Sequence, residues 1–480
     1  MKTKLILLLF VFAYLHVNAQ CTTNVVIPDA NFKTSLLNDH TIDTNSDGEI
    51  SCDEAAAFTG DMKVNGRSIA DLTGIEAFTS LTYLNCSQNS LTSLDVSKNT
   101  ALTYLYCYTN SLTSLDISTN TALEKLYCAT TGLTSLDVSQ NTALLVLSCS
   151  KNSLTSLDVS QNTALTSLTC YTNQLTSLDV TLNTALTTLD CSGNSLTTID
   201  VAQNTGLTKL DVGENSITSI DVSVHPALKY LYFENNSVTS LDVSNNPALA
   251  YLKLDNNQIT SLDVSLNPTL YTLNCVSNSL TSLDVSQNPT LYTLNCSSNN
   301  LTSLNIANGN NASAEDNMSL DATGNPDLTC IQIDAGVTYF GEWTKDATAS
   351  YNTNCDCIVD IPDANFKTSL LNDHTIDTNS DGEISCDEAA AFTGDMNVSN
   401  KSITDLTGIE AFTSLTKLTC FNNSIASLDI SKNIALAYLN CFNNSLTSLD
   451  VTQNTALTYL SFSNNSVTSI DVSQNAVLET

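Results

Sequence analysis

Two identical stretches of the chain place oxygen-bearing side chains at alternate positions. The first reads Asp43-Thr-Asn45-Ser-Asp47-Gly48-Glu49-Ile50-Ser51-Cys-Asp-Glu54, and it returns as Asp377 to Glu388. Ca²⁺ is a hard ion that takes about six to eight oxygen ligands, and a tight loop turns alternate side chains toward one point. Gly48 permits the sharp turn that such a loop needs. The pattern therefore predicts a Ca²⁺ site in each stretch.

Each loop position has an expected role. The first side chains and the last Glu would give side-chain oxygens, the central Glu its backbone carbonyl, and the Ser its hydroxyl, directly or through water. The predicted ligands are Asp43, Asn45, Asp47, Glu49, Ser51 and Glu54, and in the second copy Asp377, Asn379, Asp381, Glu383, Ser385 and Glu388. Single exposed loops of this kind bind with a Kd of about 10⁻⁴ to 10⁻³ M. An acidic surface turn is the alternative.

Short helices should position each loop. Asp29 can cap a helix whose apolar residues are Phe32, Leu36 and Leu37, and a second helix can begin near Asp53. Helix, loop and helix together match an EF-hand at every constrained loop position. Residues 27–62 recur without change at 361–396, so we expect two such caps.

The rest of the chain repeats every 21 residues. A fixed period in this range predicts stacked units, each unable to bury its apolar face alone. The unit that begins at Leu112 begins again at Leu133, Leu154, Leu175, Leu196, Ile217, Val238, Ile259, Leu280 and Leu301.

Each unit alternates apolar residues twice, once in a Leu-x-Cys segment and once in a Leu-Asp-Val segment. Leu102-Thr-Tyr-Leu105-Tyr-Cys107-Tyr-Thr-Asn110-Ser-Leu112 fits the leucine-rich pattern. Alternation with period 2 suits short strands, so two parallel ladders are expected on opposite sides of the coil. The chain resembles secreted bacterial proteins with nested leucine-rich repeats. The predicted fold is a leucine-rich repeat solenoid of short parallel β-strands, mostly β and coil, with small helical EF-hand-like caps, in two tandem modules.

The arrangement of cap and repeats resembles internalins and related surface proteins, in which an EF-hand-like cap precedes the repeats. This resemblance implies binding of a partner along the ladder face. The two loops lie 334 residues apart, which excludes a dockerin. Caps of the internalin kind can lose the ion, whereas both copies here keep every ligand type.

Two columns of Asn recur with the repeat, and an Asn amide can satisfy backbone groups that the coil buries. We expect both columns to be structural. The first asparagine column comprises Asn89, Asn110, Asn152, Asn173, Asn194, Asn215, Asn236, Asn257, Asn278 and Asn299. The second asparagine column comprises Asn99, Asn120, Asn141, Asn162, Asn183, Asn204, Asn246, Asn267 and Asn288.

Most of the 16 Cys occupy a repeat column that also accepts Val212, Phe233 and Leu254, so we expect buried thiols there. Oxidation within this column remains the alternative. Six Cys lie off the column and are candidates for disulfides: Cys21, Cys52, Cys330, Cys355, Cys357 and Cys386. Cys330 should pair with Cys355 or Cys357, the remaining one with Cys386, and Cys21 with Cys52.

The net charge of −33 argues against nucleic acid as a partner. Ten carboxylates form one outward column, which we interpret as a solvated face, with a cation-binding stripe as the alternative. They are Asp95, Asp116, Asp137, Asp158, Asp179, Asp200, Asp221, Asp242, Asp263 and Asp284.

The N-terminus predicts export. Residues 1–19 have two Lys, an apolar run and small residues before a cut, as a secretory signal does, and no later stretch is apolar enough to span a membrane. We expect a secreted or cell-surface monomer. The predicted organisation is signal 1–19, cap 20–67, repeat array 68–311, C-terminal cap 312–357, second cap 358–400 and incomplete array 401–480. Related exported Bacteroidota proteins often end in a sorting domain, and none is visible here.

No catalytic constellation is recognisable, so we expect a protein that is not an enzyme. Function should then lie on columns that vary, and Tyr is a favoured contact residue. The candidates are Tyr83, Tyr104, Tyr106, Tyr108, Tyr127 and Tyr171 in front, and Tyr230, Tyr232 and Tyr251 further along. The hypothesis is adhesion or protein binding along the ladder. The alternatives are a glycan-binding accessory protein, or the non-catalytic part of a longer secreted enzyme.

Overall fold

The structure, a computed structural model, describes residues 24–310, 318–337, 340–341, 343–355, 358–378 and 382–479. It forms two compact units, one ending at Leu249 and the other beginning at Ala250. This division falls inside the predicted array 68–311. The domain boundaries drawn from the sequence stay predictions.

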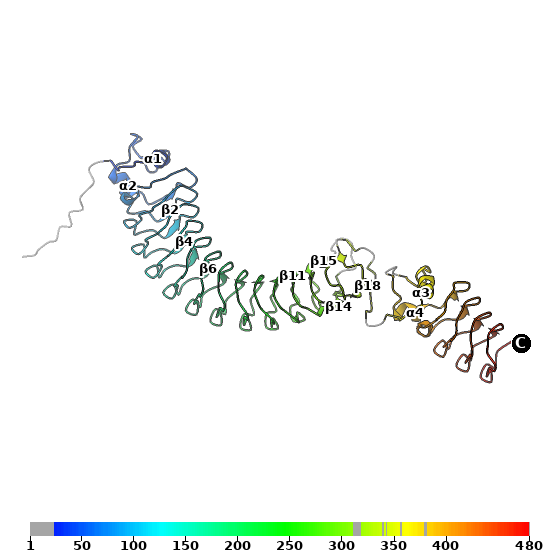
Figure 1. Ribbon diagram of the computed structural model, residues 1–480. Helices are drawn as coiled ribbons and strands as arrows, with labels where there is room; N and C mark the ends of the chain where they lie inside the picture. The colour runs from blue at the N-terminus through cyan, green and yellow to red at the C-terminus, as the bar shows by residue number, and fades with distance from the viewer. Residues whose placement is uncertain are drawn as a thin grey trace, which may run out of the picture. The chain divides into compact units, whose positions relative to one another are not determined.

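The first unit has two short helices followed by a parallel ladder (Figure 1). The helices are α1 (Ala30–Leu37) and α2 (Cys52–Ala57), and Ile75–Ala77 forms a 3-10 turn. The strands are β1 (Asp61–Lys63), β2 (Tyr83–Asn85), β3 (Tyr104–Tyr106), β4 (Lys125–Tyr127), β5 (Val146–Ser148), β6 (Ser167–Thr169), β7 (Thr188–Asp190), β8 (Lys209–Asp211) and β9 (Tyr230–Tyr232). In each strand the central residue is buried and its two neighbours face outward.

The second unit contains three sheets of parallel strands. One runs through β10 (Tyr251–Lys253), β11 (Thr272–Asn274), β13 (Thr293–Asn295), β15 (Ser319–Ala322) and β17 (Thr344–Lys345). Another comprises β12 (Ser282–Asp284), β14 (Ser303–Asn305), β16 (Cys330–Gln332) and β18 (Ser350–Asn352). The third comprises β19 (Asp395–Asn397), β20 (Lys417–Thr419), β21 (Tyr438–Asn440) and β22 (Tyr459–Ser461), preceded by α3 (Ala364–Leu371) and α4 (Cys386–Ala391), with a 3-10 turn at Ile409–Ala411.

The repeat sets the register. Leu105 pairs with Leu126, and Leu126 with Leu147, so within the regular array each strand residue pairs with the one 21 positions further along the chain. These leucines are fully buried, as are Val138 and Val159 of the other side of the coil. Burial of both apolar segments in the interior coils confirms the predicted leucine-rich solenoid.

The expectation of two complete ladders is wrong. Among the described residues the Leu-x-Cys segments form strands throughout, but the Leu-Asp-Val segments form strands only at β12 and β14, besides one bridge between Asp95 and Asp116. Strands β12, β14, β16 and β18 lie side by side, in this order, in one sheet. Alternation dictates which side chains are buried, whereas pairing also requires neighbouring coils to approach to about 4.8 Å on that side. The sequence pattern does not encode that distance.

The two asparagine columns bind backbone groups, as expected for structural residues. In the first asparagine column, Asn152 Nδ2 donates to the carbonyls of Cys128 and Cys149, both at 3.0 Å, and its Oδ1 accepts the Leu133 N–H at 3.1 Å. In the second asparagine column, Asn162 Nδ2 donates to Val138 O at 2.9 Å and to Asn141 O at 2.8 Å. Asn162 is fully buried.

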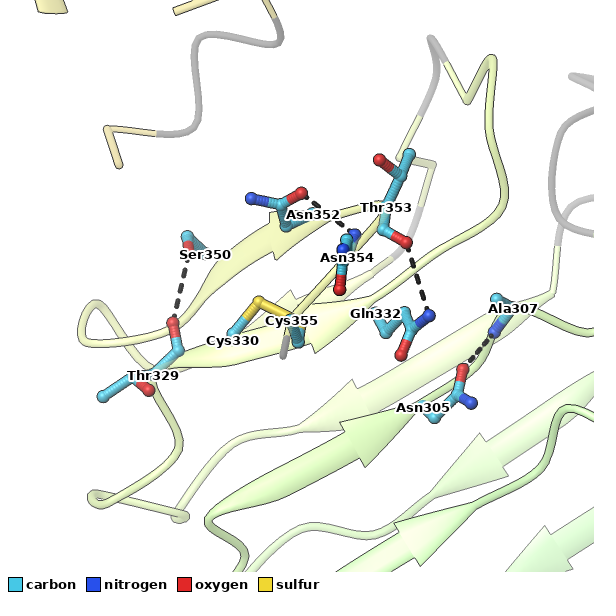
Figure 2. The surroundings of a disulfide bond; sticks show 10 residues. All are labelled: Asn305, Ala307, Thr329, Cys330, Gln332, Ser350, Asn352, Thr353, Asn354 and Cys355. Carbon is cyan, nitrogen blue, oxygen red and sulfur yellow. Dashed lines mark hydrogen bonds between the residues drawn. A yellow bond between two sulfur atoms is a disulfide. The ribbon is translucent and has the colours of Figure 1, made fainter. Parts of the chain in front are cut away.

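A disulfide joins β16 to the segment after β18 (Figure 2). It connects Cys330 and Cys355, one of the two pairings that the sequence left open for Cys330. Cys52 and Cys386 are also disulfide-bonded, while Cys21 and Cys357 lie outside the described residues. Nearby, the Trp343 indole N–H donates to Met318 O, and Phe340 stacks on Tyr351 with ring centroids 4.7 Å apart. Aromatic packing and a disulfide thus occur together, as predicted for residues 312–357.

Candidate functional site

The first cap is built around two N-capped helices. Asp29 Oδ1 accepts the N–H groups of Asn31 and Phe32 at 2.9 Å, which caps α1. Its Oδ2 accepts the N–H groups of Ala70 at 2.8 Å and Asp71 at 3.2 Å. One carboxylate therefore caps the helix and also ties it to the first coil. Sequence reasoning found the helix cap but missed the tie.

The candidate calcium loop lies between α1 and α2. Asp43 is 4% exposed, and its Oδ2 accepts the Gly48 N–H at 3.3 Å. Its Oδ1 is buried and accepts no hydrogen bond from the described residues. Asn45 and Asp47 are held by local bonds, since Asp47 N–H donates to Asn45 Oδ1 at 2.8 Å. A buried carboxylate oxygen without a donor is what a cation ligand in this loop would provide.

Both carboxylate oxygens of Glu54 accept backbone hydrogen bonds, whereas a bidentate ligand would turn both toward the ion. Its Oε2 accepts the Ser51 N–H at 2.9 Å in a capping box, and its Oε1 accepts the Thr44 N–H at 3.0 Å. The Ser51 N–H is the largest cause that lowers the pKa of Glu54, which falls to about 2. The carboxylate thus closes the loop through backbone amides. To coordinate an ion with both oxygens, it would have to give up the bond to Thr44.

The remaining predicted ligands partly fit a calcium loop. The Glu49 side chain turns away to Lys33, with 2.7 Å between Oε2 and Nζ, which leaves only its backbone carbonyl for an ion, as predicted. Lys367 and Glu383 repeat this pair at 2.6 Å. Ser385 N–H likewise donates to Glu388 Oε2 at 3.0 Å, and Asp377 is 4% exposed. Asn379 and Asp381 lie outside the described residues. Within the described part of the chain, no three His, Cys, Asp or Glu side chains are arranged to hold a metal ion.

The predicted front tyrosines form a cluster on β2, β3 and β4. Tyr83 contacts Tyr106 with centroids 5.3 Å apart, and Tyr106 stacks on Tyr127 at 4.6 Å with nearly parallel rings. Tyr104 lies beside Tyr83 at 6.1 Å. In the described residues, no ring contact joins Tyr108 or Tyr171 to this cluster.

Lysines cover two of these rings. Lys63 Nζ lies 5.5 Å from the centroid of Tyr83, and Lys125 Nζ lies 5.2 Å from that of Tyr104. Lys151 Nζ similarly lies 5.8 Å from the Tyr171 ring. Each of these rings therefore has one face in contact with another ring or with a cation, and its edge and hydroxyl are left for contact.

The structure adds tyrosines that sequence reasoning missed. Tyr271 and Tyr292 stack with centroids 5.3 Å apart, and 42% and 45% of their surfaces are exposed. Tyr251 contacts Tyr271 at 5.9 Å. Tyr230 and Tyr232 contact each other at 6.3 Å in the first unit. Tyr271 and Tyr292 occupy a column that holds Thr at positions 82, 103, 166, 187 and 208, and these two aromatic residues in it were the available signal.

Carboxylates on β7 and β8 were also missed. Asp190 and Asp211 are register partners on adjacent strands, and Lys209 Nζ lies 3.6 and 3.9 Å from their Oδ2 atoms. Burial, reinforced by the Asp190 and Glu234 carboxylates, raises the pKa of Asp211 to about 7. Asp211 therefore binds a proton near neutral pH.

The column cysteines are buried thiols. Ten Cys are free and buried: Cys86, Cys107, Cys128, Cys149, Cys170, Cys191, Cys275, Cys296, Cys420 and Cys441. Burial raises the pKa of the Cys107 and Cys149 thiols to about 12. A protonated thiol without access to solvent is a poor nucleophile, so this column serves packing.

The chain is similar to known leucine-rich repeat proteins in structure. No protein-family model matches the chain. The functional domain of InlJ from Listeria monocytogenes, which includes a cysteine ladder, superposes with a TM-score of 0.54 and 31% identity, over 90% of this chain and 77% of that chain. The chain is an internalin-like leucine-rich repeat protein.

Two further likenesses agree with this assignment. A segment of 73 residues is 38% identical to internalin J of L. monocytogenes serotype 4b. This segment is 15% of the present chain and matches 8% of the length of that relative. An internalin (inlF) from L. monocytogenes 4b superposes with a TM-score of 0.53 and 24% identity, over 68% of this chain and 97% of its own, and shows the shared fold.

Proposed function

We propose that this protein is an exported, non-enzymatic interaction or adhesion protein that binds a protein partner on its ladder face. The observation that carries the proposal is the stacking of Tyr106 on Tyr127 across adjacent strands. Elsewhere the ladder presents mostly Ser, Thr, Asn and Asp. Rigid tyrosines lose little conformational entropy on binding and offer both apolar area and a hydroxyl.

Ring contacts favour a protein over a glycan at this cluster. Stacking of a sugar needs a free ring face, and Lys63 and Lys125 each occupy one face of Tyr83 and Tyr104. Tyr106 and Tyr127 occupy one face of each other, so fewer faces are left for a sugar. Edges and hydroxyls suit the mixed polar and apolar surface of a protein partner.

The test uses the full chain with variants on opposite sides of the same coils. Tyr106→Ser/Tyr127→Ser should weaken capture of a protein partner at least about tenfold, as expected for loss of aromatic anchors. Gln140→Ala/Gln161→Ala, on the Leu-Asp-Val side, should leave capture unchanged. Equal binding by both variants would exclude the tyrosine face as the interface.

We also propose Ca²⁺ in the caps, held by the predicted loop ligands. The buried Oδ1 of Asp43 and the outward Glu49 side chain support this proposal. The ion would supply a fixed positive charge that joins the two ends of the loop. Because the Glu54 carboxylate already accepts amide hydrogen bonds, coordination must replace some of them, and a Kd of about 10⁻⁴ to 10⁻³ M is expected.

Calorimetric titration of Ca²⁺ into chelator-treated protein tests the cap. Binding should be saturable and raise the melting temperature, should lose one of its two sites in Asp43→Ala, and should be lost altogether in Asp43→Ala/Asp377→Ala. Asp53→Ala, in the same cap but outside the ligand set, should bind as the parent protein does. Absence of both heat and a melting shift would leave this segment an acidic turn.

Export is part of the proposal. The predicted signal at residues 1–19 lies outside the described residues. The Cys330–Cys355 disulfide supports an oxidising location. Within the part of the chain that the structure describes, no helix is long and apolar enough to cross a membrane.

A further inference from the structure

A pocket of about 240 Å³ lies between α1 and the turn that follows β1. Three of its residues lie on one face of α1 and a fourth is the C-cap of that helix, at the helical spacing of three, four and seven positions. The lining residues are Asn31, Thr34 and Ser35 from the helix and Asn38 from its C-cap, with Lys63 and Arg67 opposite. The pocket uses neither the calcium ligands nor the stacked tyrosines of the ladder.

One wall of the pocket is cationic. Arg67 is the only Arg in a chain of net charge −33. Its backbone N–H donates to Asn89 Oδ1 at 3.0 Å, while its guanidinium makes no hydrogen bond or ion pair with the described residues. Lys63 pairs with Asp61 at 2.9 Å, but both side chains are more than half exposed, at 60% and 54%. Such a surface pair is weak, but Lys63 Nζ also lies 5.5 Å from the Tyr83 ring centroid, so Arg67 is the main cation that this wall offers an anion.

The opposite wall consists of hydrogen-bond acceptors. Thr34 Oγ1 donates to Ala30 O at 2.7 Å and Ser35 Oγ donates to Asn31 O at 2.8 Å, so both hydroxyl protons are already used. The Asn31 amide donates through Nδ2 to Ser68 O at 3.1 Å. The hydroxyl oxygens and Asn31 Oδ1 are left as acceptors, while Asn31 keeps a second amide N–H and Asn38 adds an amide that donates and accepts. Sugar hydroxyls, which donate and accept, therefore suit the helix wall, and a negative charge suits Arg67.

We propose that this pocket binds one acidic sugar unit, a monosaccharide residue that carries a carboxylate or a sulfate. Its hydroxyls donate to Thr34, Ser35 and Asn31. Its anionic group accepts two parallel N–H bonds from the Arg67 guanidinium. An inorganic oxyanion would match only the cationic wall, and an uncharged sugar only the helix. The volume is below the roughly 300–1,000 Å³ of pockets for drug-sized ligands, as suits a single ring.

The second cap provides an internal control. Helix α3 has the same sequence as α1, but Asn397 and Lys401 stand where the first cap has Lys63 and Arg67. The acceptor wall is thus duplicated without the guanidinium. Binding should occur only at the first cap.

The experiment is calorimetric titration of the full chain with trigalacturonate, the matching uncharged galactose trimer, and sodium sulfate, all at one ionic strength. The acidic trimer should bind at one site. Arg67→Gln should weaken it at least about tenfold, the usual effect of losing a charged hydrogen bond. Lys401→Gln should bind as the parent protein does, and Thr34→Val should weaken binding severalfold. Unchanged melting temperatures establish that each variant folds.

Four results would overturn the proposal. Equal binding of the uncharged trimer would remove the role of Arg67, and sulfate binding as tight as that of the acidic trimer would leave an anion site only. Binding that survives Arg67→Gln, or no binding of the acidic trimer, would dismiss the pocket. None of these results affects the ladder, whose variants carry their own test.

Discussion

The two sides of each coil use asparagine in different ways. On the Leu-x-Cys side, Asn152 both donates to two carbonyls and accepts the amides of Thr131, Gly132 and Leu133. On the Leu-Asp-Val side, Asn162 donates to two carbonyls, but its buried Oδ1 accepts no hydrogen bond from the described residues. The first asparagine column therefore joins neighbouring coils from both ends, and the second works as a donor only.

Exceptions in each column show what the fold requires. Thr131 replaces Asn in the first asparagine column, and its Oγ1 donates to Cys128 O at 2.9 Å. His225 replaces Asn in the second, where its Nε2 lies 3.1 Å from Val201 O. Both substitutes keep a hydrogen bond to a carbonyl of the coil. The donor is thus the common requirement, and the acceptor is specific to the Leu-x-Cys side.

The largest predicted loss of stability comes from replacing a buried Asn amide, which donates to carbonyls, with a carboxylate. Asn162→Asp places a carboxylate against two carbonyls in a fully buried site, and should cost about 4 kcal/mol or more of unfolding free energy. Asn152→Asp should cost less, about 2 kcal/mol, because three backbone amides still donate to the carboxylate. Chemical denaturation of both variants measures the difference. Equal losses would show that the two columns do not differ in this way.

Carboxylates on the Leu-x-Cys and Leu-Asp-Val sides should also change the stability of the fold with pH in opposite directions. The pKa of Asp211, on the Leu-x-Cys side, is raised to about 7, chiefly by burial. Between 3.8 and about 7 the folded chain holds a proton that the unfolded chain has released, so stability falls as pH rises. Asp211→Asn should therefore be more stable than the parent protein above pH 7, by on the order of 2 kcal/mol.

Asp158, on the Leu-Asp-Val side, gives the matched contrast. The Ser160 N–H donates to its Oδ1, and this bond is the largest cause that lowers the pKa of Asp158 below 3.8. Its stabilising contribution is present above 3.8 and is lost as pH falls through the folded-state value. Above about pH 4, Asp158→Asn should melt below the parent protein, and above about pH 7 Asp211→Asn should melt above it, while both differences should vanish at low pH. Shifts of the same sign in the two variants would contradict the assigned environments.

A smaller change in stability is expected at His225, which replaces Asn in the second asparagine column. The ring of His225 makes one hydrogen bond to a carbonyl, whereas Asn204 in the preceding coil makes two, to Val180 and Asn183. His225→Asn should therefore stabilise the array by about 1 kcal/mol. Urea denaturation measures this, with Asn204→His as the reverse control. Destabilisation by His225→Asn would mean that ring volume matters more than the second bond.

The smallest effect concerns the turns after the Leu-x-Cys strands. Thr130 has a left-handed backbone with φ of 55°, which is unfavourable for a β-branched residue, whereas Asn443 occupies the same turn in the later array with φ of 54°. Asn443 Nδ2 also donates to Asn422 Oδ1 at 2.9 Å. Thr130→Asn should stabilise by about 0.5 to 1 kcal/mol and Asn443→Thr should destabilise slightly more. Paired thermal melts check both changes.

Much of this fold follows from the sequence alone. The 21-residue period fixes the register of the ladder, because Leu105 and Leu126 are equivalent positions in adjacent coils. The alternation of each segment fixes which side chains are buried, and the column shared by Cys, Val212 and Phe233 identifies a core position. The helix caps at Asp29 and Ser51 are local interactions, so they could also be read from the sequence.

Tertiary structure decided what depends on distances between coils and between elements. Most Leu-Asp-Val segments do not pair as strands, because packing of the whole repeat sets the spacing of neighbouring coils on that side. It directed the Glu54 carboxylate to the Thr44 amide, and stacked Tyr271 on Tyr292. It also brought Arg67 opposite the polar face of α1, which lies some thirty residues earlier in the chain. A repeating sequence specifies columns within an array, but contacts between cap and array depend on how the two pack.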